Sequence, residues 1–155
     1  MGGMGAGGYI SPIEQQGDAM KLAAMMALCA CCAEAGDLQL EITGCRPGSS
    51  VQVALYDSAR GFGSEHAEGA SRRTSLVAHG DRLRVDFAGL PSGRYAVSAF
   101  DDVNGNGRLD RNFAGFPVEP YGFSHDARRV FLAPDFEKAA FELRDDVVFE
   151  TIHLK

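Results

Sequence analysis

The chain has 155 residues, with 15 basic and 21 acidic residues and a net charge of −6. Its hydrophobic fraction of 45% is enough to build one core, and its 19 glycines favour loops and turns over long helices. Because the charge is negative, the chain has no electrostatic reason to bind nucleic acid or an anionic bilayer.

The first 35 residues differ sharply in composition from the rest. Residues 1–19 are rich in glycine and show no hydrophobic period, which is typical of a disordered leader or of a start site assigned too early. Residues 20–35 read MKLAAMMALCACCAEA, in which a basic residue precedes an apolar run and a small-residue motif. This pattern predicts a secretory signal peptide cleaved before Gly36, with a short buried helix as the alternative. The run is too short for a membrane-spanning helix, which needs about 20 apolar residues.

Three of the four cysteines lie inside this proposed signal peptide, which leaves Cys45 alone in residues 36–155. That domain therefore cannot form an internal disulfide and must depend on its apolar core. The clustered cysteines lack a second Cys or His pair at metal-ligand spacing. Residues 28–31 partly resemble a lipoprotein box, so a lipid anchor at Cys31 is the alternative to cleavage before Gly36. From Gly36 onward the chain has 14 basic and 18 acidic residues, hence a net charge of −4.

Apolar and polar residues alternate with a period of two throughout residues 36–155, and no long helical stripe occurs. We expect strands at residues 38–43, 51–56, 74–79, 82–87, 94–100, 128–133, 138–143 and 147–154, with a helical turn at 135–138 as an alternative. The residues assigned to core faces include Leu83, Val85 and Phe87 and also Tyr95, Val97 and Ala99. Short strands at intervals of roughly 8–12 residues predict an all-β fold, an antiparallel two-sheet sandwich of seven to eight strands.

A polar stretch follows the expected strand 94–100 and reads DDVNGNGRLDRNFAGFPVEPYGFS over residues 101–124. From Asp102 its spacing resembles the first nine positions of an EF-hand calcium loop. The side chains of Asp102, Asn104, Asn106 and Asp110, with the Arg108 carbonyl, are expected to converge on a calcium ion. The Asn-Gly pairs are also favoured in plain tight turns, so a turn without a metal is the alternative.

The twelfth position of this loop is Phe113, so the bidentate glutamate of an EF-hand is missing. We expect Glu119 to close the site, with Asp101 as a further ligand. A surface position or an ion pair with Arg111 is the alternative for Glu119. The low ligand charge predicts a weak, structural calcium site with a Kd of roughly 10⁻⁴–10⁻³ M.

Catalytic motifs are missing from the sequence, which argues against an enzyme. It has no nucleophile elbow, no helical zinc motif and no phosphate loop. Asp57, Ser64 and His66 share one expected loop, but their spacing matches no known triad, although triads are defined by geometry. Cys45 is expected to be a small packed residue and not a nucleophile.

Aromatic residues around the polar loop suggest a ligand site. Tyr121 and Phe123, with Phe62 and Phe116, could form a stacking patch for a carbohydrate or another small ligand. The alternative is that these rings cover the core. Rings in loops, Phe113 among them, could also contact a protein partner.

Four stretches resemble a bacterial family catalogued as domain of unknown function 2141. They are VQVALYDSARGF (51–62), LPSGRYAVSAFDDVNGNGRLD (90–110), GFPVEPYGFS (115–124) and FEKAAFEL (136–143). Two positions depart from the family pattern, because Asp101 stands where members usually have His and Pro120 where Gly is frequent. The resemblance implies a small exported domain with an immunoglobulin-like or transthyretin-like sandwich and no settled activity.

These observations lead us to expect an exported, periplasmic or extracellular, non-enzymatic domain of residues 36–155. We expect it to act as a binding or envelope-associated structural module, with an envelope protein or a glycan as partner. The alternatives are a carbohydrate- or small-ligand-binding domain and, less favoured, a hydrolase.

Overall fold

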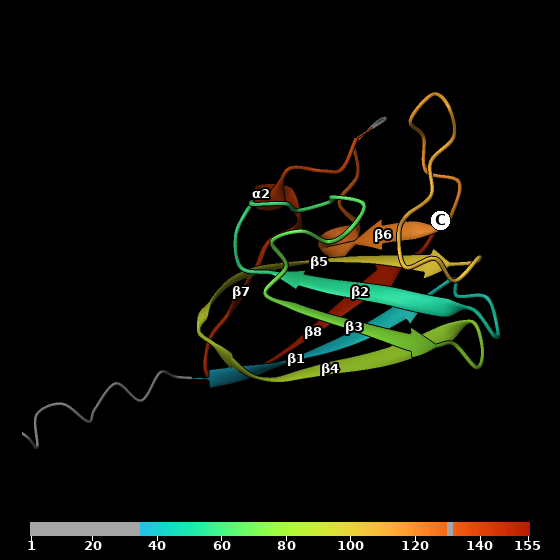
Figure 1. Ribbon diagram of the computed structural model, residues 1–155. Coiled ribbons are helices and arrows are strands. Elements are labelled where there is room, and N and C mark those ends of the chain that lie inside the picture. The colour runs from blue at the N-terminus through green and yellow to red at the C-terminus, as the bar shows by residue number, and fades with distance from the viewer. Residues whose placement is uncertain (1–34, 130–131) are drawn as a thin grey trace, which may run out of the picture. The chain divides into compact units, whose positions relative to one another are not determined.

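The computed structural model describes residues 35–129 and 132–155, which form a sandwich of two β-sheets (Figure 1). Its strands are β1 (Ala35–Thr43), β2 (Ser50–Tyr56), β3 (Arg72–Val77), β4 (Arg82–Pro91), β5 (Gly93–Asp102), β6 (Tyr121–Phe123), β7 (Phe141–Leu143) and β8 (Val147–His153). A 3-10 turn, η1 (Ser124–Asp126), and one short helix, α2 (Phe136–Ala139), accompany them. The predicted leader and residues 20–34 of the predicted signal peptide, Cys31 among them, lie outside the described residues, and Ala35, its last residue, begins β1.

One sheet has the strand order β4-β1-β8, and the other has the order β3-β2-β5-β6, with β7 also paired to β5. The predicted two-sheet sandwich is therefore confirmed. All strand pairs are antiparallel except β1 and β8, which are parallel. In this pair Asp37 lies opposite Val147 at one end and Thr43 lies opposite His153 at the other. The chain passes from the first sheet to the second between β4 and β5 through the single residue Ser92.

The core lies between the two sheets, where the period-two alternation places apolar side chains. Leu38, Leu40 and Ile42 of β1 are at most 2% exposed. Burying each large aliphatic side chain of this kind contributes about 1.5–3 kcal/mol. The expected core residues of β4 and β5 are confirmed, with Leu83 half-buried at the margin of the core; they are Val85, Phe87, Tyr95, Val97 and Ala99.

A second apolar cluster covers part of the outer face of the five-stranded sheet. Tyr56 and Ala96 point away from the main core, yet both are fully buried. Phe62, from the loop after β2, packs edge-on against Tyr56 and against Phe136 of α2, with ring centroids 5.2 and 5.7 Å apart. Strands β2 and β5 are thus covered on both faces at this end, and Phe62 belongs to this cluster and not to an exposed patch.

Two expected elements near the C-terminus are different in the structure. The residues described within 128–133 are not in a strand, and residues 130–131 lie outside the description. Over residues 134–143 the alternative of a helical turn is correct, because α2 precedes the short strand β7.

Strand β6 lies inside the stretch that we expected to be loop. Its residue Tyr121 exchanges backbone hydrogen bonds with Lys155, at 3.3 and 3.2 Å, which brings β6 to the end of the other sheet. At Gly122 a Cβ atom would lie 2.8 Å from the His153 carbonyl oxygen and 2.6 Å from Ile152. A glycine is therefore required where the two sheets approach each other.

Candidate metal centre

Strand β5 ends in two acidic residues that point to opposite faces, because side chains alternate along a strand. Asp101 is fully buried on the inner face. Its carboxylate accepts a hydrogen bond from the Arg46 backbone N–H at 3.2 Å and another from the Ser49 hydroxyl. The Asp101 side chain therefore holds the turn before β2, and the structure does not bring it to the polar loop.

Asp102 points to the outer face and organises the loop that follows. Its Oδ1 accepts the Asn106 N–H at 3.0 Å, and its Oδ2 accepts the Gly107 N–H at 2.8 Å. The Gln52 side chain of β2 also donates to Oδ2, at 3.2 Å. The tight return is possible because Gly105 and Gly107 adopt φ values of +72° and +76°, which favour glycine. The Asp102 carboxylate thus joins the loop to the sheet.

The middle of the loop consists of two successive Asx turns. Asn104 Oδ1 accepts the Asn106 N–H at 3.1 Å, and Asn106 Oδ1 accepts the Arg108 N–H at 2.9 Å. The amide groups of both asparagines donate to the Asp110 carboxylate, at 2.5 and 2.9 Å. The Arg108 guanidinium lies 3.4 Å from the same carboxylate. The side chains of Asn104, Asn106 and Asp110 therefore meet, whereas the Asp102 carboxylate binds the loop backbone.

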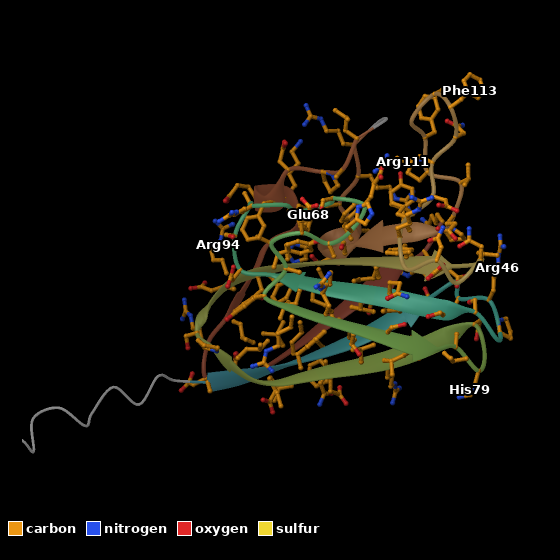
Figure 2. All side chains as sticks on the ribbon, viewed as in Figure 1. Arg46, Glu68, His79, Arg94, Arg111 and Phe113 are labelled. Carbon is orange, nitrogen blue, oxygen red and sulfur yellow. The ribbon has the colours of Figure 1, made fainter. Side chains whose placement is uncertain are left out.

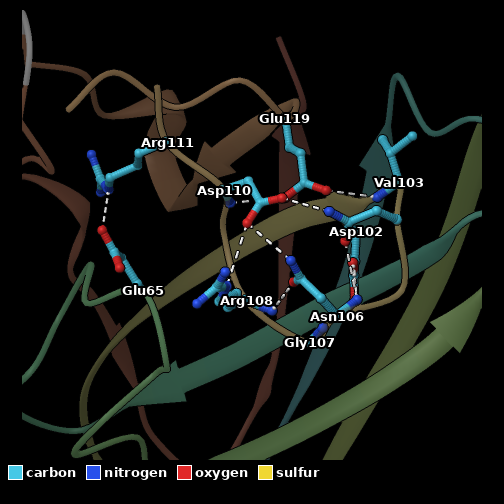
Figure 3. A network of polar contacts seen from close by, with 10 residues as sticks. Glu65, Asp102, Val103, Asn106, Gly107, Arg108, Asp110, Arg111 and Glu119 are labelled. Carbon is cyan, nitrogen blue, oxygen red and sulfur yellow. Dashed lines mark hydrogen bonds and ion pairs between the residues drawn. The ribbon is translucent and has the colours of Figure 1, made fainter. Parts of the chain in front are cut away.

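Glu119 closes the loop, as Figure 3 shows. Its Oε1 accepts the Val103 N–H at 2.9 Å, and its Oε2 accepts the Asp110 N–H at 3.0 Å. The residue is only 6% exposed. The alternative of an ion pair with Arg111 is not formed, because Arg111 lies 2.8 Å from Glu65 instead. Glu119 therefore fixes both ends of the segment from Val103 to Asp110.

The buried charge in this loop has no basic counterpart among the described side chains. Asp102 is 2% exposed, and like Glu119 it forms no salt bridge within residues 35–129 and 132–155. Buried charges in proteins are usually paired or bound to a metal. The same part of the chain contains no preformed group of three or more His, Cys, Asp or Glu side chains that could hold an ion. A cation here would therefore also need asparagine and backbone oxygens.

The outer part of the loop carries exposed apolar side chains at its tip (Figure 2). Asn112 Oδ1 accepts the N–H groups of Ala114 and Phe116, both at 3.0 Å, and fixes the turn. Phe113 is fully exposed and Phe116 is 37% exposed. Neither Phe113 nor Phe116 lines the cavity that contains Tyr121 and Phe123.

The residues considered for catalysis do not form a triad. In the described structure no hydrogen bond joins the side chains of Asp57, Ser64 and His66, and Ser64 Oγ accepts the Glu68 N–H at 2.8 Å. Burial raises the pKa of the Cys45 thiol, and the nearby Asp101 carboxylate raises it further. The thiol is therefore kept protonated, which is unfavourable for a nucleophile.

Ser124, at the end of the Tyr-Gly-Phe-Ser motif, has a structural role that sequence reasoning missed. It is fully buried, and its Oγ accepts the Val97 N–H at 2.9 Å and donates to the Ala139 carbonyl at 2.6 Å. It therefore connects β5 with α2 and fixes the position of β6. Ser124 follows the three-residue strand β6 within a polar stretch, so no hydrophobic period in the sequence could have indicated that it is buried.

Fold and site together define a small β-sandwich domain with an acidic, Asx-turn loop at the end of a central strand. The model of a family described as uncharacterised protein conserved in bacteria, domain of unknown function 2141, matches residues 40–150. The chain belongs to this family, and the match includes the complete loop with Glu119. No curated protein and no solved structure matches the chain.

We expect Glu119→Gln to lower the free energy of unfolding by about 1–3 kcal/mol, because one buried backbone N–H then faces an amide donor in place of an oxygen. Urea denaturation measures the change. The matched control is Glu68→Gln, an exposed glutamate in the loop after β2, which should leave stability unchanged. Equal stabilities for the two variants would show that Glu119 does not hold the loop.

Acid should weaken the loop through Asp110. The hydrogen bond from Asn106 is the main cause that lowers the pKa of this carboxyl, with Asn104 and Arg108 adding to it and burial opposing it. A lowered folded-state pKa means that the carboxylate stabilises the fold above about pH 4, and that this contribution is lost as the pH falls further.

We therefore expect the free energy of unfolding of Asp110→Asn to fall less steeply than that of the wild type between about pH 4 and pH 2. Denaturant titrations at fixed pH values measure both curves. Asp145→Asn, with the same charge change in an exposed turn, is the control and should follow the wild type. Parallel curves for wild type and Asp110→Asn would contradict this role.

Proposed function

We propose that the protein is an exported, non-enzymatic β-sandwich module whose loop binds calcium as a structural cofactor. The observation that carries the proposal is the pair of nearly buried carboxylates, Asp102 and Glu119, which face one loop without a basic partner among the described side chains. A divalent cation would compensate this charge. Calcium suits an irregular set of oxygen ligands better than magnesium, which requires near-ideal octahedral geometry.

The residues that would hold the ion are Asp102, Asn104, Asn106, Asp110 and Glu119, with the Arg108 carbonyl. Each asparagine oxygen already accepts one backbone N–H, but it has a second lone pair for a cation. Asp110 would exchange the two amide donors and Arg108 for the ion. Because this exchange costs existing hydrogen bonds, it supports a weak site of roughly millimolar Kd.

The binding role is supported by exposed apolar side chains in the outer part of the loop. Phe113 and Val118, at 106% and 60% exposure, together with Phe116 offer apolar surface to an envelope protein or a glycan. No helix in the described part of the chain is long and apolar enough to cross a membrane. A small-ligand-binding role is the second candidate, because Tyr121 and Phe123 line a cavity of about 290 Å³ beside the loop.

Calcium should raise the melting temperature, because it binds only the folded loop. At 10 mM calcium and a Kd of about 1 mM, the gain is about 1.4 kcal/mol, which corresponds to a shift of roughly 4–8 °C. The test is a thermal melt in calcium, in magnesium and in chelator, with a smaller shift expected for magnesium.

Asp102→Asn should lose most of the calcium shift, whereas Asp145→Asn, in an exposed turn, should retain it. If the wild type shows no calcium-dependent shift, the loop is a metal-free turn. A full shift in Asp102→Asn would place the ion elsewhere on the protein.

Export predicts that the mature protein begins at Gly36, after the small-residue motif at Ala33–Ala35. N-terminal sequencing of protein isolated from the producing cell measures this directly. A lipidated N-terminus at Cys31 would replace the cleavage site but keep export. Recovery of full-length protein with Met1 from the cytoplasm would contradict export.

A further inference from the structure

The cavity beside the loop lies on the outer face of the five-stranded sheet, and two cross-strand rows form its floor. Residues paired directly across neighbouring strands share one face of a sheet. One row consists of Ser75, Gln52, Phe100 and Tyr121, and the next consists of Arg73, Ala54, Ser98 and Phe123. Residues 64–67 and the loop residues Gly107 and Leu109 form the walls. The pairing register of β3, β2, β5 and β6 therefore determines which side chains line the cavity, and the core holds these strands in place.

The lining divides into an apolar side and a polar side. Phe100 and Tyr121, both half-buried, lie next to each other across β5 and β6, and Leu109 adds to this apolar side. The opposite side carries the Gln52 amide and the hydroxyls of β3. Gln52 donates through Nε2 to Asp102 and to Ser50, at 3.2 and 3.4 Å. Neither hydrogen bond uses its Oε1, which can therefore accept a hydrogen bond from a ligand.

Two charged side chains belong to the lining. The Glu65 carboxylate lies 2.8 Å from the Arg111 guanidinium, so a cationic ligand would have to compete with Arg111 for it. Arg73 is exposed and donates one hydrogen bond, at 3.2 Å, to the His66 carbonyl. The groups on the floor between these charges, Gln52, Ser98, Phe100 and Tyr121, are uncharged, and a ligand held by these four residues would be neutral.

A buried tyrosine lies behind two of the cavity-lining serines. Tyr56 is fully buried, and among the described residues no atom meets its OH with full hydrogen-bond geometry. Burial raises the pKa of this phenol, and the hydroxyls of Ser98 and Ser64 lower it partly. Ser98 and Ser64 both line the cavity, whereas Tyr56 does not.

We propose that this cavity binds a single ring of a neutral sugar, with one ring face on Tyr121 and Phe100 and its hydroxyls on Gln52 and Ser98. The volume of about 290 Å³ is at the lower limit of the roughly 300–1,000 Å³ of ligand pockets, which fits one ring and not an oligosaccharide. This inference rests on the proposed binding role and does not require calcium.

The test is a titration of the isotope-labelled protein followed by NMR, with glucose, galactose, mannose and N-acetylglucosamine as probes. At least one of these sugars should saturate, with the largest shifts at the amides of residues 52, 98 and 121. Glucuronic acid, glutamate and arginine serve as charged probes and should not saturate. Ser98→Leu should weaken sugar binding at least 10-fold, because the larger leucine side chain would fill the cavity. Tyr121→Ala, which removes one stacking ring, should also weaken binding and serves as the second variant in case Ser98→Leu does not fold.

The matched control is Thr151→Leu, an equivalent change at an exposed position of β8 outside the cavity, which should bind like the wild type. Saturation by none of the four sugars at 50 mM, unchanged affinity in both cavity variants, or saturation by a charged probe alone would overturn the proposal. Repeating the titration in calcium and in chelator separates the two proposals. Sugar binding without any calcium response contradicts only the calcium site, and a calcium response without sugar binding contradicts only this inference.

Discussion

The bidentate hydrogen bonding of Glu119 is the interaction on which the outer part of the molecule depends. Its two carboxylate oxygens hold the backbone at Val103, directly after β5, and at Asp110, where the loop turns away from the sheet. The chain can then return to pair β6 with β5 and with the C-terminal end of the other sheet. The cost is a charged carboxylate at 6% exposure with only backbone dipoles as partners among the described groups. That cost is the physical reason to expect a cation in the loop.

The loop and the cavity form one structural unit, because contacts of Asp102 and Glu65 connect them. Asp102 accepts hydrogen bonds from the loop backbone and from Gln52 on the cavity floor. Glu65 pairs with Arg111 and accepts the Leu109 N–H through its carbonyl at 3.4 Å. A cation that orders the loop would also fix one wall of the cavity. The second apolar cluster around Tyr56 and Phe62 holds the opposite wall.

The long strands were predictable from the sequence, because burial of one sheet face enforces a period of two over six or more residues, as at Leu38, Leu40 and Ile42. The contact among the Asn104, Asn106 and Asp110 side chains agrees with their spacing, because a tight loop directs alternate side chains to one side, whereas a common centre that includes Asp102 stays a prediction. Strand β6 was missed because three residues cannot show a period, and the parallel pairing of β1 with β8 has no local signal. Asp101 was assigned to the loop because spacing alone ignores the alternation that turns it inward. The cavity depends on the register among four strands, which no single segment encodes.

A crystal structure of the mature domain grown with calcium tests the metal site most directly. We expect an ion bound by oxygens of Asp102, Asn104, Asn106, Asp110 and Glu119 at about 2.3–2.6 Å, with the Asp110 carboxylate turned from the asparagine amides to the metal. A structure from saturating calcium in which Asp110 still accepts both amides, with no ion in the loop, would contradict the calcium site.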